Sequence, residues 1–397
     1  MLKIKNTSTA ALLVASLLLT VGRGMTLPFM TIYLTRQFAM DVHQVGIAMS
    51  GALTTGVLFS LFFGMLADKF DKRRYMLGAL TLFFSGFIAI PLLNHPLAVV
   101  AFFSVINCAY SVFSTVLKSY FADTLAVYEK PRVFSLNYTF INVGWTLGPP
   151  LGTWLLMYSL NLPFWIAALS AVPPLWLVGR YVQPLAPVNQ NAHIAWSPAS
   201  LLRDNALRWF TLSTFLGQLV FGAFVTCLSQ YALAIGDARL AQQIVAVVLP
   251  VNAVVVVLLQ YQVGKRVRPD NLQRLMLYGS LFFATGLLGF MVAGNNLWLW
   301  GLAAAVFTLG ELIYAPGEYM LLDHIAPPGL KASYFSAQTL GTLGGALNPL
   351  LTGYVLTWLP PWTLFALLIV VTGCAYGTML MGMRCGPFAA ARASEER

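Results

Sequence analysis

The chain has 397 residues, of which 58% are hydrophobic and only 9% are charged, and its mean hydropathy is +0.75. A soluble protein of this length needs a polar surface that this composition cannot supply, so the soluble classes are excluded. The formal net charge of +10 is compatible with a nucleic-acid partner. However, the cations gather between apolar segments, and we expect an all-α membrane protein that contacts the lipid bilayer and binds no nucleic acid.

Twelve apolar segments have about the length that crosses ~30 Å of hydrocarbon. They span residues 9–36, 43–64, 75–93, 97–118, 132–158, 162–181, 208–235, 241–263, 272–293, 297–320, 332–358 and 362–383. With the N-terminus inside the cell, three of the 23 Lys and Arg residues are not cytoplasmic, namely Arg23, Arg36 and Arg239. This positive-inside bias predicts an even number of spans with both termini in the cytoplasm.

The first span carries a charge near its middle, in Gly22-Arg23-Gly24. A charged side chain at that depth costs ~2.5–3.5 kcal/mol on insertion scales, so a functional or a pairing role is expected for Arg23.

The loop after the second span reads Gly64-Met65-Leu66-Ala67-Asp68-Lys69-Phe70-Asp71-Lys72-Arg73-Arg74. It resembles the G-x-L-a-D-r-x-G-r-k signature between helices 2 and 3 of the major facilitator superfamily, although Asp71 stands where the family usually has glycine. The resemblance implies a secondary transporter in which Asp68 caps the start of span 11 and the loop cations pair with Asp123. It predicts a cytoplasmic gate built from Gly64, Asp68, Lys72, Arg73 and Asp123, whereas Lys69 and Arg74 suit simple topology charges better.

The fourth span has one polar stripe on an otherwise apolar helix, with residues at helical spacing. The stripe is Ser104, Asn107, Ser111, Ser114 and Lys118. Many exporters of the superfamily have an arginine here that is linked to proton handling, and this chain has none. Either Arg23 has taken over that electrostatic task, or the coupling differs or is absent.

The fifth span contains Gly144-Trp145-Thr146-Leu147-Gly148-Pro149-Pro150-Leu151-Gly152. Close helix packing explains Gly144 and Gly148, and the prolines bend a helix. The string also resembles the G-x-x-x-G-P-x-x-G motif of the antiporter branches, with Gly144, Gly148, Pro149 and Gly152 in the motif positions. The whole chain is most similar to the YdeE-like group of twelve-helix drug and small-solute exporters, which implies export.

The longest polar interruption, residues 183–206, divides six spans from six. We expect an N-terminal six-helix bundle over 1–182, a cytoplasmic linker over 183–206 and a C-terminal bundle with a short cytoplasmic tail over 207–397. The halves echo each other at an offset near 200 residues, as when Asp123 is matched by Asp323. Such repeats are typical of transporters with a substrate site between the halves.

The tenth span holds the other charges at membrane depth, Glu311 and Glu318, with Tyr314 on the same predicted face. In the superfamily, spans 1, 4, 7 and 10 line a central cavity. The predicted cavity residues are Arg23, Asn107, Tyr110, Ser111, Ser114, Gln218, Glu311, Tyr314 and Glu318. We expect Glu311, Glu318 and Arg23 to couple transport to protons, with Arg23 and Glu311 approaching in at least one state. A permanent structural pair is the alternative.

These features predict a monomeric carrier of a bacterial inner membrane that exports drug-like, peptide-like or sugar-like solutes by proton antiport with alternating access. The rivals are an uptake symporter or a facilitator for a sugar or small peptide, and a membrane sensor that does not transport. No nucleophile with its base, nucleotide-binding loop or metal-ligand spacing of His and Cys is evident in the sequence. We therefore expect no enzymatic activity, no metal and no cofactor, with the proton gradient as the driving force.

Overall fold

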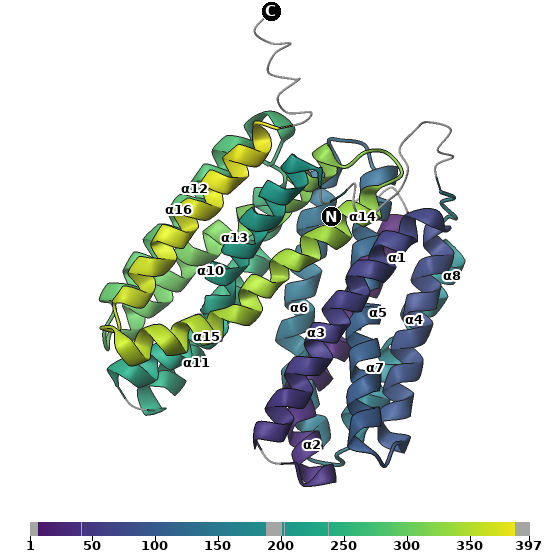
Figure 1. Cartoon of the computed structure of the whole chain (residues 1–397), viewed down its shortest axis with the longest axis horizontal. Coiled ribbons are helices and arrows are strands. Elements are labelled where there is room, and N and C mark those ends of the chain that lie inside the picture. Colours follow the sequence, from purple (N-terminus) through teal and green to yellow (C-terminus); the bar gives the residue numbers. More distant parts are fainter. Residues whose placement is uncertain (1–6, 41, 188–200, 202, 237, 386–397) are drawn as a thin grey trace, which may run out of the picture. The chain divides into compact units, whose positions relative to one another are not determined.

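The structure, a computed structural model, describes residues 7–40, 42–187, 201, 203–236 and 238–385 (Figure 1). Within these ranges all regular secondary structure is helical. Several predictions lie outside the described residues: the cytoplasmic cations Lys3, Lys5, Arg392 and Arg397, most of the linker 183–206, and the side chain of Arg239. The chain divides into two compact units, each considered by itself below.

Unit 1 comprises residues 1–125, 136–192 and 327–336. Its helices are α1 (Thr7–Thr26), η1 (Leu27–Phe29), α2 (Met30–Phe38), α3 (Val42–Leu66), η2 (Ala67–Lys69), α4 (Lys72–Ala89), η3 (Ile90–Leu92), α5 (Pro96–Thr124), most of α6 (Lys130–Leu156), α7 (Leu162–Ser170), α8 (Val172–Tyr181) and most of α14 (Lys331–Gln338). Helix α5 packs against α3 and α4, while α1 and α4 both pack against α7 and α8.

Unit 2 comprises residues 126–135, 193–326 and 337–397. It contains α10 (Asn205–Ile235), α11 (Ala238–Gly264), η4 (Pro269–Asn271), α12 (Leu272–Val292), α13 (Leu297–Ile325), η5 (Thr339–Thr342), α15 (Leu343–Trp358) and α16 (Thr363–Met383). Here α13 packs against α11 and α12, and α16 packs against α10 and α12. These neighbours correspond one for one to those of unit 1, so the repeat in the sequence is also a repeat in the packing.

Each unit includes a short segment whose sequence neighbours belong to the other. Residues 126–135, which contain the first turns of α6, belong to unit 2, and residues 327–336, which contain most of α14, belong to unit 1. The two bundles predicted from the sequence, residues 1–182 and 207–397, did not include such an exchange of segments. We refer below to 126–135 and 327–336 as the exchanged segments.

Three predicted spans are interrupted where continuous helices were expected. The span 9–36 breaks at η1, where Pro28 lies, and the span 162–181 breaks at Ala171, just before Pro173. Proline removes a backbone donor and clashes with the preceding turn, which accounts for both breaks. The third, 332–358, passes through η5 between α14 and α15.

The charged loop after the second span is shorter than predicted. Helix α3 runs to Leu66 and α4 already begins at Lys72. The Asp71 carboxylate accepts a hydrogen bond from Arg74 N at 2.9 Å, which satisfies a free amide of the first turn and fixes the start of α4. Asp71 therefore has a local reason to replace the glycine of the family signature.

Nine stretches of the described residues are long and apolar enough to cross a membrane. The predicted spans 132–158, 208–235 and 332–358 are not among them, although they too are helical, as α6, α10 and α14 to α15.

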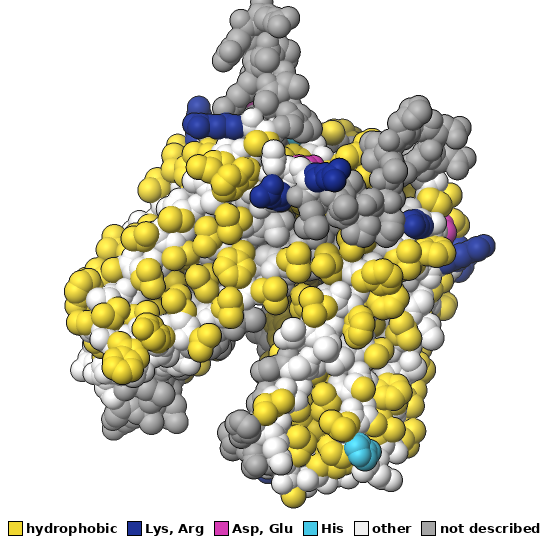
Figure 2. Space-filling view, in the orientation of Figure 1, with side chains coloured by type: hydrophobic (Ala, Val, Ile, Leu, Met, Phe, Trp, Pro, Cys, Tyr) yellow, Lys and Arg dark blue, Asp and Glu magenta, His cyan; other side chains and the backbone are white. Residues whose placement is uncertain are grey.

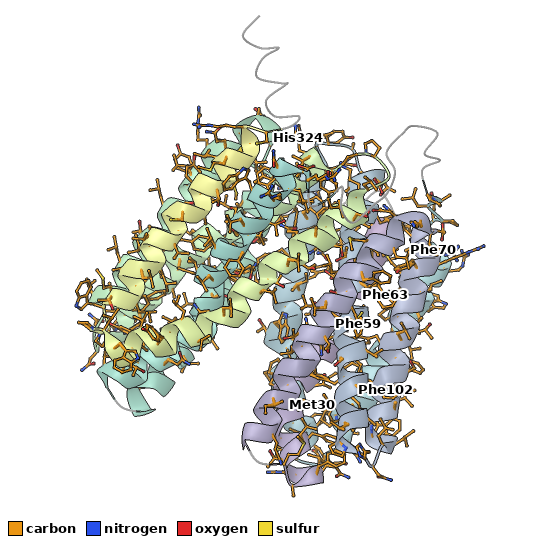
Figure 3. All side chains as sticks on the ribbon, in the orientation of Figure 1. Met30, Phe59, Phe63, Phe70, Phe102 and His324 are labelled. Carbon is orange, nitrogen blue, oxygen red and sulfur yellow. The ribbon has the colours of Figure 1, made fainter. Side chains whose placement is uncertain are left out.

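On the visible face of each unit, hydrophobic side chains cover the helices, and Lys and Arg gather near their ends (Figure 2). Figure 3 labels Phe59 and Phe63 of α3 and Phe102 of α5, which are 56%, 41% and 36% exposed. Such apolar surface suits lipid contact.

Candidate functional site

Arg23 is positioned by close packing on either side of it. A Cβ atom on Gly148 of α6 would lie 2.7 Å from Gly24 Cα, so these two helix backbones touch, and neither position has room for a side chain. Gly144 and Gly152 also face α1, at Thr20 and Met25. The predicted antiporter-type motif, including Pro149 inside α6, thus lies along the α1–α6 contact of unit 1.

The Arg23 guanidinium is held by neutral groups of unit 1. Its Nε and Nη2 donate to Asn107 Oδ1 at 3.2 and 3.0 Å. It lies over the rings of Tyr110 at 4.4 Å and Trp145 at 5.7 Å, positions that give cation–π attraction. The Tyr110 hydroxyl lies 3.0 Å from Thr20 Oγ1. We call Arg23, Asn107, Tyr110 and Trp145 the Arg23 site.

The polar stripe predicted on the fourth span is divided between two neighbouring helices. Ser104 Oγ accepts a hydrogen bond from Thr55 Oγ1 of α3 at 3.0 Å, whereas Asn107 contacts Arg23 of α1. Ser111 and Ser114 are half-buried on the same helix. Their role in a substrate cavity stays a prediction.

Glu311 lies in α13 of unit 2 and is 2% exposed. Its Oε2 accepts a hydrogen bond from Asn252 Nδ2 of α11 at 2.7 Å, and the same amide group lies 3.0 Å from Thr308 Oγ1. Sequence reasoning missed Asn252. A signal was available, because Asn252 is an isolated amide in the apolar run Val247–Leu259, and a polar side chain at such a place asks for a partner. We call Glu311, Asn252 and Thr308 the Glu311 site.

Glu318, seven residues further along α13, has different neighbours. With Ser213, Thr214 and Gln338 it lines a small cavity with room for about one water molecule, whose other walls are apolar. Gln338 Nε2 donates to Thr214 Oγ1 at 3.3 Å, and the Tyr314 hydroxyl donates to the Ser213 carbonyl at 3.1 Å. Gln218, also predicted for the cavity, is half-buried on α10. The face predicted for span 10 is therefore divided between α11 and α10.

Arg23 and Glu311 belong to different units. Each has hydrogen-bond partners inside its own unit, as described above. Their predicted approach across a cavity stays a prediction.

Asp68 caps the start of α14, which lies in the exchanged segment 327–336 of unit 1. Its Oδ1 and Oδ2 accept hydrogen bonds from Ala332 N at 3.0 Å and Ser333 N at 2.7 Å. A carboxylate here accepts hydrogen bonds from two amides that have no partner within the helix, and it interacts favourably with the positive end of the helix dipole. Gly64 makes the approach feasible, because a Cβ there would collide with the Ser336 side chain.

The cations after Asp68 are bound within the same unit. Lys72 Nζ forms a partly buried ion pair with Asp123 and donates to Ser119 Oγ, and Arg73 Nη2 donates to the Gly179 carbonyl. The contacts expected for Asp68 and for Lys72 are thus present. That this group, with Gly64, acts as a gate stays a prediction.

Replacing Asp68 by Asn should loosen the start of α14, because an amide offers one acceptor oxygen where the carboxylate offers two. Loss of a charge-assisted hydrogen bond costs about 1.5–3 kcal/mol, and we expect amide exchange over residues 331–338 to accelerate by about tenfold or more. Hydrogen–deuterium exchange with mass spectrometry measures it. Asp71→Asn, which alters a cap on α4, is the matched control, and equal exchange in the two variants would contradict the assignment.

The other ion pair of the described residues is buried, and it was not predicted. Lys130 Nζ lies 2.7 Å from Asp323 Oδ2, with side chains 10% and 9% exposed. Lys130 belongs to the exchanged segment of unit 2, and sequence reasoning had placed it only among the topology cations. Arg132, in the first turn of α6, and Lys265, just after α11, both lie over the Tyr261 ring of α11, at 5.3 and 4.1 Å.

Comparison with known proteins fits this fold. The Major Facilitator Superfamily model matches residues 12–349. The chain is 58% identical to the MFS-type transporter YdeE of Escherichia coli K12, over 96% of this chain and 97% of the relative. It is 23% identical to a Na(+), Li(+), K(+)/H(+) antiporter of Planococcus maritimus, over 88% and 90% of the two chains.

Among solved structures, a bacterial homologue of the iron transporter ferroportin, in an outward-facing state, matches with a TM-score of 0.78 at 13% identity, covering 95% of this chain and 99% of that one. The resemblance to the YdeE-like group that was predicted from the sequence is confirmed. The chain is a membrane transporter and not an enzyme, and it belongs to the major facilitator superfamily.

Proposed function

We propose that this transporter exports small organic solutes in exchange for protons, by alternating access. The observation that carries the proposal is the Glu311 site, a carboxyl group 2% exposed in the middle of α13. Ionisable groups at membrane depth are costly, and in transporters they mark proton and substrate pathways. A proton-driven carrier needs such a group.

The hydrogen bond from Asn252 suits a carboxyl group that gains and loses a proton. An amide N–H can donate to the oxygen of either the carboxylate or the neutral acid. A lysine in that place would favour the charged form strongly. The Glu311 site can therefore keep its geometry in both protonation states. Glu318, beside a cavity with room for about one water molecule, is the second candidate for proton transfer.

Arg23 completes the proposed coupling. In at least one state it would approach Glu311 and favour loss of the proton, and a change of state would separate the two charges. The predicted cytoplasmic gate around Asp68 would close the cytoplasmic side in the outward-facing state. In the partly buried pair of Lys72 with Asp123, the desolvation cost offsets much of the Coulombic attraction, which suits a latch between states that differ by a few kcal/mol.

The direction of transport rests on two further observations. The fifth span carries the glycines and proline of an antiporter-type motif, and one relative is named an antiporter that exchanges alkali cations against protons. We propose a monomer in the bacterial inner membrane with both termini in the cytoplasm, as the distribution of Lys and Arg predicts. Drug-like, peptide-like and sugar-like solutes all remain candidates for the cargo.

The test uses purified protein in liposomes that contain a pH-sensitive dye. With an acidic interior, adding a solute outside should raise the internal pH, because the antiporter exchanges internal protons for the solute. An uptake symporter would carry protons inward with the solute and lower the internal pH, and a facilitator moves solute without changing the internal pH. Empty liposomes and a protonophore are the controls, and solute entry that leaves the internal pH constant would contradict antiport.

A further inference from the structure

Within the described residues of unit 1, Arg23 is a cation at membrane depth and no carboxylate lies at that depth. The acidic residues of unit 1 are Asp41, Asp68, Asp71 and Asp123, and the last three lie beyond or at the ends of helices. Asp41 lies outside the described residues, and within unit 1 the described ion pair is that of Lys72 with Asp123. Arg23 is therefore a costly charge whose contacts in its own unit are an amide and two aromatic rings.

The hydrogen bonds to Asn107 occupy one edge of the guanidinium. Nε and Nη2 form the side edge, and both donate to the same oxygen. Asn107 Nδ2 in turn donates to the Phe103 carbonyl at 2.9 Å, which fixes the orientation of the amide. The end edge, Nη1 with Nη2, offers a pair of parallel donors that fits a carboxylate in a bidentate manner.

The aromatic rings beside the guanidinium indicate the nature of the rest of the ligand that carries the carboxylate. Tyr110 and Trp145 hold Arg23 from two sides and are half-buried, so part of each ring is accessible. A planar apolar group attached to a carboxylate can pack against such a ring while the carboxylate meets the guanidinium. A single positive charge balances one negative charge, which favours a monoanion over a dianionic phosphate ester.

We propose that the Arg23 site binds the carboxylate of a small organic monoanion with an aromatic or apolar body, and that this anion is a transported solute. The second part depends on the transport function proposed above. The first part is independent of it, because recognition of the anion requires neither a proton gradient nor Glu311.

Isothermal titration calorimetry of the purified protein tests the proposal with 2-naphthoate and its uncharged analogue 2-naphthamide. The unaltered protein should bind naphthoate about tenfold or more tightly, the scale of a charge-assisted hydrogen bond. In Arg23→Gln the two should bind within about twofold of each other. Arg23→Lys, which keeps the charge but not the planar fork, should retain part of the preference.

The matched control is Arg36→Gln, which removes an exposed cation from α2 and should leave the preference unchanged. Equal affinity for the two probes in the unaltered protein, no measurable binding of naphthoate, or a full preference in Arg23→Gln would each overturn the proposal. If naphthoate binds selectively but fails to raise the internal pH of acid-loaded liposomes, anion recognition stands and the part of the proposal that makes the anion a transported solute fails.

Discussion

In a variant with Glu311→Gln, solute-driven proton movement should fall by about 100-fold or to background, the scale on which a positioned proton-transferring group contributes. Gln keeps the size of the side chain and an oxygen that can accept from Asn252 Nδ2, so the Glu311 site keeps its hydrogen bond. It cannot gain or lose a proton. The dye-loaded liposomes described above measure the loss, and unfolding in detergent should change by less than about 1 kcal/mol, because the contacts are preserved.

Two comparisons separate coupling from general damage. Glu129→Gln removes a carboxylate from the turn before α6 and should leave transport unchanged. Exchange of labelled for unlabelled solute at equal pH should continue in Glu311→Gln, since that exchange needs no net proton movement. Full solute-coupled proton movement in Glu311→Gln would remove this residue from the proposed role.

Lys130→Met should destabilise the protein by about 3–5 kcal/mol, because it leaves Asp323 buried without its cation. The pair lies at 2.7 Å and is about nine-tenths buried, so water cannot replace the ammonium group. The double variant Lys130→Met/Asp323→Leu should recover most of the loss, since removing both charges also removes the cost of burying them. Unfolding by titration with SDS measures all three proteins.

The matched control for this pair is Lys265→Met. Lys265 is exposed and lies over the Tyr261 ring, so its loss should cost no more than about 1 kcal/mol. If Lys130→Met and Lys265→Met are equally mild, the ion pair contributes little. A double variant that is less stable than Lys130→Met would show that Asp323 has a more important partner than Lys130.

Helix positions could be predicted from the sequence because they depend on local composition. The segment 272–293 was predicted and α12 spans Leu272–Val292, since an apolar run of that length has no other stable arrangement in a bilayer. The breaks at Pro28 and Pro173 were missed although proline is visible in the sequence. A proline near a helix end is tolerated or disruptive according to its neighbours, and the sequence does not show those neighbours.

Contacts between residues that are far apart in the sequence were harder to predict. Asp68 and Ala332 are 264 residues apart, and their contact was expected only through resemblance to a family with the same loop. Lys130 and Asp323 are 193 residues apart, and no periodicity connects them. Asn252 is a single polar residue with no spacing to interpret. For Glu311, burial cost alone singled out the residue, but which helix supplies its partner depends on tertiary packing.

The exchanged segments impose an order on the folding of this protein during its synthesis. When the ribosome has produced Asp68, the amides of Ala332 and Ser333 lie 264 and 265 residues further on. Unit 1 cannot complete its own contacts until nearly the whole polypeptide has entered the bilayer. Until then the Asp68 carboxylate lacks these two amide donors, so its hydrogen bonds in a nascent first half differ from those in the finished protein.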